Sequence, residues 1–164
     1  MGGSVDTKAV EFRLLKLGTL DDLLAEVDRL VAAETTGALR RTGNWTLGQT
    51  FGHLAGWMTY PYDGYPPDVR PPWFVRLILR GQKKKLFTSG VPRGVRIPRI
   101  EGGTKSTEVL STDEGARRVR AAAIRMKATA PTLPNPIFGR LTHAEWIGMN
   151  LRHAELHLGY MQPV

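Results

Sequence analysis

The segment from Thr142 to Met161, THAEWIGMNLRHAELHLGYM, carries the most restrictive pattern in this 164-residue sequence. Its apolar residues recur at intervals of three and four, which is the spacing of one buried face of a helix. Leu151 and Leu158 lie on that face, and His153 and His157 lie beside it, about one helical turn apart. A helix with such a stripe has to pack against other helices or a sheet.

Three further segments have helical periodicity, and none of the sequence has a convincing strand pattern, an internal repeat or low complexity. Pro61 is expected to stop the second of these helices. The expected helices cover residues 20–33, 47–60, 112–129 and 142–161, and capping boxes open the last three at Thr46–Gln49, Ser111–Glu114 and Thr142–Glu145. The sequence therefore predicts one all-α domain over residues 1–164, with four principal helices.

A long connection separates the second and third of these helices, and it is strongly basic. The whole chain has a formal net charge of +8, from 23 basic and 15 acidic residues. Residues 70–99 contain no acid and nine basic residues, which are Arg70, Arg76, Arg80, Lys83, Lys84, Lys85, Arg93, Arg96 and Arg99. Such a segment is typical of a solvated surface, and it could also face nucleic acid, an anionic membrane or an acidic small molecule.

Composition excludes several classes of protein. With no cysteine the chain has no disulfide, no thiolate metal site and no cysteine nucleophile, which is compatible with a reducing compartment. No apolar run approaches the roughly 18 residues of a membrane span, and the N-terminus lacks the apolar region of a signal peptide. We therefore expect a cytoplasmic protein with no membrane association.

Three of the four histidines lie at the edges of core-facing stripes. His53 is on the helix expected at 47–60, and His153 and His157 are on the last helix, whereas His143 is expected at the surface. Three imidazole ligands, with water in the remaining coordination position, are typical of a catalytic site for a first-row divalent ion. Histidines at a bundle edge are also commonly satisfied by backbone or solvent, so the spacing alone leaves both interpretations open.

Two blocks of sequence resemble a known family. The first runs from Gly43 to Gln49 (GNWTLGQ) and continues as HLA from His53, and the second contains PIFGRLT from Pro136, then EW, then RHAELHL from Arg152. Both resemble a branch of unknown function in the DinB/YfiT-like superfamily of metalloenzymes. The order of the helices, the long second connection and the chain length also fit, so that the similarity covers most of the chain.

The resemblance implies a four-helix bundle in up-down-down-up order. It also implies a divalent metal, such as zinc, nickel or manganese, held by positions that correspond to His53, His153 and His157. Characterised relatives in the wider superfamily are thiol-dependent transferases and an isomerase, in which the metal activates the thiol of a low-molecular-weight cofactor. For this chain the resemblance therefore indicates a metal site whose chemistry is open.

The first functional hypothesis is a metal-dependent S-transferase or hydrolase that acts on a small molecule. Residues on the same helix faces as the histidines are candidates for its pocket walls, although core packing explains each of them as well: Trp57, Tyr60, Trp146 and Asn150. The alternative is a non-catalytic binding module that uses the basic segment 70–99 for nucleic acid or an acidic partner, although no nucleic-acid motif occurs in the sequence. A third reading is a scaffold in which the metal only stabilises the fold, and dimerisation is left open.

Overall fold

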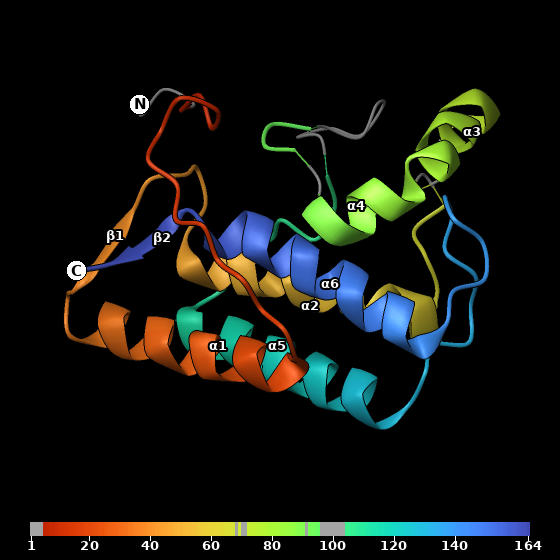
Figure 1. The fold of residues 1–164 in the computed structure, drawn as a ribbon. Helices are drawn as coiled ribbons and strands as arrows, with labels where there is room; N and C mark the ends of the chain where they lie inside the picture. Colours follow the sequence, from red (N-terminus) through yellow and green to blue (C-terminus); the bar gives the residue numbers. More distant parts are fainter. Residues whose placement is uncertain (1–4, 68, 70–71, 91, 96–103) are drawn as a thin grey trace.

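The computed structural model describes residues 5–67, 69, 72–90, 92–95 and 104–164. The described part is mostly helical, with six helices and one small two-stranded sheet (Figure 1). The elements are α1 (Leu20–Thr35), β1 (Leu39–Arg41), α2 (Leu47–Asp63), α3 (Trp73–Gly81), α4 (Lys83–Ser89), α5 (Thr112–Ala128), α6 (His143–Leu158) and β2 (Met161–Pro163). No helix in the described residues is long and apolar enough to cross a membrane.

The four long helices enclose the hydrophobic core. Helix α1 contacts α5 and α6, and α2 contacts the same two helices, most extensively α5. Each helix contributes side chains that are almost completely removed from water, among them Leu23, Leu30, Phe51, Leu54, Val119, Met126, Leu151 and Leu158. Burial of such side chains is the main stabilising term for a chain of this size. The helical stripes predicted from the sequence are therefore the faces that pack together.

The predicted helix starts agree well with the structure, because the capping side chains are in place. Thr46 and Thr142 each accept a hydrogen bond from the backbone three residues on, and Gln49 and Glu145 return it. Ser111 also caps α5, but the Glu114 carboxylate binds Arg117 and Arg118 instead of returning to the cap. The capping side chains of Thr46, Ser111 and Thr142 thus mark where these three helices begin.

The predicted ends of two helices were wrong. Helix α2 continues through Pro61 to Asp63, because Pro61 is close to the C-terminus and the Gly64 amide still bonds the Tyr60 carbonyl. The last helix ends at Leu158, earlier than expected, since residues 161–163 form a strand. Strand β2 pairs antiparallel with β1, so the absence of strands was also a wrong expectation. Strands of three residues are too short to leave a periodic signal in the sequence.

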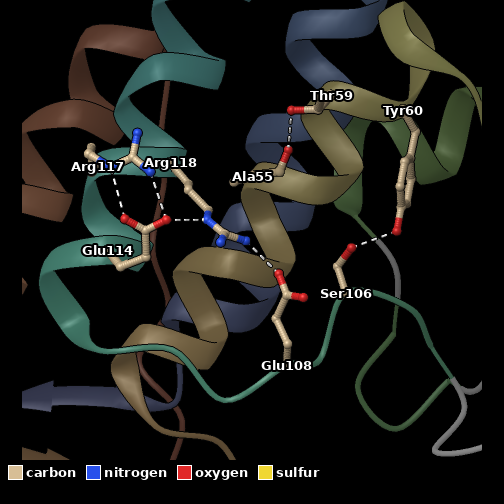
Figure 2. Close-up of polar contacts among 8 residues, drawn as sticks. All are labelled: Ala55, Thr59, Tyr60, Ser106, Glu108, Glu114, Arg117 and Arg118. Carbon is tan, nitrogen blue, oxygen red and sulfur yellow. Dashed lines mark hydrogen bonds and ion pairs between the residues drawn. The ribbon is translucent and has the colours of Figure 1, made fainter.

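The segment 104–111, which leads into α5, lies directly on α2. Close approach needs glycines on the facing side of α2: a Cβ at Gly48 would lie 2.2 Å from the Leu110 carbonyl oxygen, and one at Gly56 would lie 2.1 Å from Ser106 Oγ. Figure 2 shows this segment tied to α2 through Tyr60 and Ser106, and to α5 through Glu108 and Arg118. These contacts bring backbone groups of the long connection against α2.

The basic connection is partly helical within its described residues. It contains α3 and α4, which are separated at Gln82. Figure 1 shows α3 standing apart from the four long helices, whereas α4 packs on α6. Arg70, Arg96 and Arg99 of the predicted basic segment lie outside the described residues. Two helices therefore occupy much of residues 72–90 of the connection.

Candidate metal centre

The structure brings His53, His153 and His157 together. His53 comes from the middle of α2, and the other two come from the last turns of α6. The ring centroids are 4.5–4.9 Å apart, and one ring nitrogen from each histidine lies within 4.8 Å of the other two. His53 is fully buried, and His153 and His157 are half-buried.

A backbone carbonyl sets the orientation of the His53 ring. Its Nδ1 lies 2.7 Å from the carbonyl oxygen of Lys105. Since a carbonyl can only accept, Nδ1 carries the hydrogen in the neutral ring, and Nε2 presents its lone pair to the other histidines. This is the arrangement that orients histidine ligands in metal sites, where the second nitrogen donates to an oxygen.

The Nε2 atoms of His53 and His153 are 3.1 Å apart. Two lone pairs cannot face each other at this distance, so either a proton on His153 or a cation must lie between them. Two nitrogens that bind one ion at about 2.1 Å are themselves about 3.0–3.4 Å apart for angles between octahedral and tetrahedral. The spacing of this pair therefore fits a shared divalent ion, and equally fits an imidazole–imidazole hydrogen bond.

The segment that supplies the carbonyl is held in a constrained conformation. Ser106, the residue after Lys105, has a positive φ of 55°, and outside glycine this conformation is uncommon and unfavourable. Its hydroxyl lies 2.6 Å from the Tyr60 hydroxyl, an interaction visible in Figure 2. The contact with α2 therefore stabilises a turn that directs the Lys105 carbonyl toward His53.

Burial keeps all three imidazoles neutral. It lowers the pKa of His53 to about 4, partly offset by the hydrogen bond to Lys105. It also holds the pKa of His153 and of His157 well below the ordinary value, and their mutual proximity lowers them further. Neutral imidazoles are the form that binds metal ions, so this cluster does not have to lose protons near pH 7 to act as a ligand set.

Aromatic side chains surround the cluster. Trp45 stacks on the His157 ring, with centroids 5.1 Å apart and planes 9° from parallel. Trp57 lies edge-on to His53 and His153, and its buried indole Nε1 has no hydrogen-bond partner among the described residues. A buried N–H without a partner costs free energy unless a ligand or water accepts it. Trp57 can therefore donate to a molecule bound beside the histidines.

The four proposed wall residues fall into two groups. Trp57 and Tyr60 lie next to the cluster, and Tyr60 holds Ser106 in place. Trp146 and Asn150 are buried in the core, where the Asn150 side chain donates to the Trp146 carbonyl. The group that orients the His53 ring is the Lys105 carbonyl and not one of these four side chains.

Other contacts at the site were not foreseen from the sequence. Trp45 precedes its helix and Lys105 acts through its backbone, so neither leaves a pattern of side-chain types. His143, expected at the surface, is half-buried and its Nε2 lies 2.5 Å from the Met126 carbonyl oxygen, which ties α6 to the end of α5. It lies outside the histidine cluster.

A cleft of about 510 Å³ lies elsewhere on α6. It is formed by the N-terminal segment around Phe12 and Leu15, the end of α4 at Ser89, and Arg152 with Leu156 of α6. None of the three histidines lines it. The cleft is therefore separate from the histidine cluster.

The fold and the site define a class of protein: a mostly helical chain with a buried three-histidine cluster that could hold a metal ion. A family model, described as "Protein of unknown function (DUF1569)", matches residues 10–164, and the chain belongs to that family. No curated protein and no solved structure matches the chain. The family description assigns no activity.

Proposed function

We propose that this protein is a divalent-metal-dependent enzyme, and that His53, His153 and His157 hold the ion. The observation that carries the proposal is the orientation of His53. Its Nδ1 is occupied by the Lys105 carbonyl, and its Nε2 faces a second histidine nitrogen at 3.1 Å. Three neutral nitrogen donors with no fourth protein ligand in the cluster resemble catalytic sites more than closed structural ones.

The donor set favours an anionic or readily deprotonated substrate. The histidine cluster contains no carboxylate, so the protein ligands leave the charge of a divalent ion uncompensated. A divalent ion would supply Lewis acidity, which polarises a carbonyl group or favours the deprotonated form of a thiol or water. Transfer of a low-molecular-weight thiol to an electrophile, or hydrolysis, is the chemistry we propose, with Trp57 positioned to donate to the substrate.

We also propose that the family is related to the DinB/YfiT-like superfamily and that the chain is an up-down-down-up four-helix bundle. Two features support this relationship. The sequence blocks that resemble the superfamily are those that place His53 on α2 and the histidine pair on α6. The long connection also lies between the second and third of the four long helices.

Metal content tests the proposal most simply. Purified protein incubated with zinc, nickel or manganese and then freed of excess ion should retain about one equivalent of at least one of them, as measured by elemental analysis. His153→Ala should retain none, because it removes one of the two Nε2 atoms that lie 3.1 Å apart. His143→Ala is the matched control, since His143 bonds a carbonyl away from the cluster, and it should keep the metal. Wild-type protein that retains no ion would overturn the proposal.

An activity screen separates an enzyme from a scaffold stabilised by metal. Metal-loaded protein should transform electrophilic or hydrolysable test substrates, and dependence on an added small thiol would identify a transferase. Trp57→Phe should retain the metal and lose affinity for substrate, because Phe keeps an aromatic ring at this position but has no N–H to donate. Metal-loaded protein that is inert toward a broad panel of thiols, electrophiles and esters would favour the scaffold.

A further inference from the structure

Helix α3 exposes an unusual number of large apolar side chains. Trp73 is 74% exposed, and Phe74, Leu77 and Ile78 are each more than half exposed. At about 100° per residue, these four positions cover an arc of about 140° on one side of the helix. Single exposed apolar residues need no explanation, but four on one helix face mark an interaction surface.

Cations accompany this apolar face. Residues 72–90 contain five basic residues and no acidic one: Arg76, Arg80, Lys83, Lys84 and Lys85. Lys83 pairs with Glu145, and Arg80 Nε donates to the Ile137 carbonyl. Lys84 and Lys85 are exposed and have no ion pair within the described part of the chain. These two lysines are on α4, which follows α3 after Gln82. A partner that offers both hydrocarbon and negative charge would complement the apolar face and these nearby cations.

We propose that α3 and α4 bind the surface of an anionic membrane. The apolar face of α3 would enter the boundary between headgroups and acyl chains, and Lys84 and Lys85 would contact the lipid phosphates. A helix of nine residues is only about 14 Å long, so it lies in the membrane plane and does not span the bilayer. Figure 1 shows α3 apart from the core helices, so that insertion leaves the core packed.

Two other partners account for this surface less well. A symmetric dimer through α3 would bring the cations of the two copies together, and of the five in each copy only Lys83 is paired with an acid, Glu145. Nucleic acid would neutralise the cations but leave Leu77 and Ile78 in water. Peripheral binding also differs from the expectation of no membrane association, which rested on the lack of spanning and signal segments.

Vesicle sedimentation with the full-length protein tests the proposal. The protein should bind vesicles that contain phosphatidylglycerol, bind vesicles of phosphatidylcholine alone much less, and dissociate as salt rises. Ile78→Glu should weaken binding by at least about tenfold, because it places a charge in the inserted face. Ile124→Glu is the matched control: Ile124 lies on α5 and is 58% exposed against 59% for Ile78, and its substitution should leave binding unchanged.

Charge is tested by a second pair of variants. Lys84→Gln should weaken binding about fivefold, and Lys16→Gln, at an exposed site before α1, should have little effect. Absence of binding to anionic vesicles at low salt would overturn the proposal. So would a dimer, or a complex with DNA, that forms without vesicle binding and is lost in Ile78→Glu.

Discussion

At the scale of single residues, the proposed metal site depends on how each histidine ring is oriented. His53 is fixed by a carbonyl that belongs to a segment 52 residues further along the chain. Trp45 holds the His157 ring by stacking. Supporting contacts of this kind raise metal affinity because fewer ring orientations are lost on binding. The cluster is thus ordered before any ion arrives.

The lowered pKa values predict how metal-free protein responds to acid. His53 takes up a proton at about pH 6.5 when unfolded and only near pH 4 when folded. The unfolded state therefore binds more protons between these values, and the free energy of unfolding should fall as pH drops through this range, by about 3 kcal/mol for His53 alone.

Urea unfolding of metal-free protein at several pH values measures this effect. His53→Asn keeps a donor for the Lys105 carbonyl but does not titrate, so its stability should depend less steeply on pH than that of the wild type. Equal slopes in the two proteins between pH 6.5 and pH 4 would contradict the burial of a neutral His53.

At the scale of elements, the close contact between α2 and segment 104–111 positions the site. That contact depends on the absence of a side chain at Gly56, where a Cβ would lie 2.1 Å from Ser106 Oγ and 2.6 Å from Ser106 Cβ. Neither atom is the end of a long flexible chain. The backbone that carries the Lys105 carbonyl can therefore lie against α2 only because residue 56 is glycine.

Gly56→Ala should displace this segment from α2. We expect a loss of about 1–3 kcal/mol in the free energy of unfolding from overpacking. Metal affinity should fall about 10–100-fold, as is usual when a partner that orients a ligand is lost. Calorimetric titration with zinc and denaturant unfolding measure the two effects.

Gly148→Ala is the matched control for the glycine substitution. Gly148 is also within a long helix, and a Cβ there would meet no atom within 4 Å. Alanine should be neutral or stabilise the helix by up to about 1 kcal/mol, with unchanged metal affinity. If Gly56→Ala behaves like Gly148→Ala, the close contact does not position the site.

The sequence predicted the long helices well because their signals are local. Periodic apolar residues and capping side chains such as Thr46 and Thr142 fix a helix and its first turn. The ends were less predictable, since Pro61 is tolerated in the final turn of α2. Side-chain burial was also less predictable, since the apolar Ile124 of α5 is mostly exposed whereas its neighbours Ala122 and Ala123 are buried.

At the scale of the whole molecule, the site joins parts of the chain that are far apart in sequence. The helix faces predicted which three histidines could be ligands. The structure adds that they lie close together. The contributions of Lys105 and Ser106 were not predictable, since they depend on backbone geometry and on a close approach between distant segments. Metal binding should therefore link the folding of α2, α6 and the long connection.

This linkage predicts that metal raises the thermal stability of the entire domain. An ion at about 100 times its dissociation constant contributes about 2.7 kcal/mol, which corresponds to an increase in Tm of about 5–10 °C for a chain of this length. Calorimetry should show the shift with zinc and its reversal by a chelator. Mg²⁺, which prefers oxygen ligands, should have no effect. A shift that persists in His153→Ala would point to a different site.

X-ray absorption spectroscopy of the zinc-loaded protein tests most directly whether three imidazoles share one ion. We predict nitrogen or oxygen atoms at about 2.0–2.1 Å from the zinc ion and outer-shell scattering from three imidazole rings. His157→Ala should reduce that scattering to two rings. A spectrum with no imidazole scattering, or with oxygen ligands alone, would contradict the account.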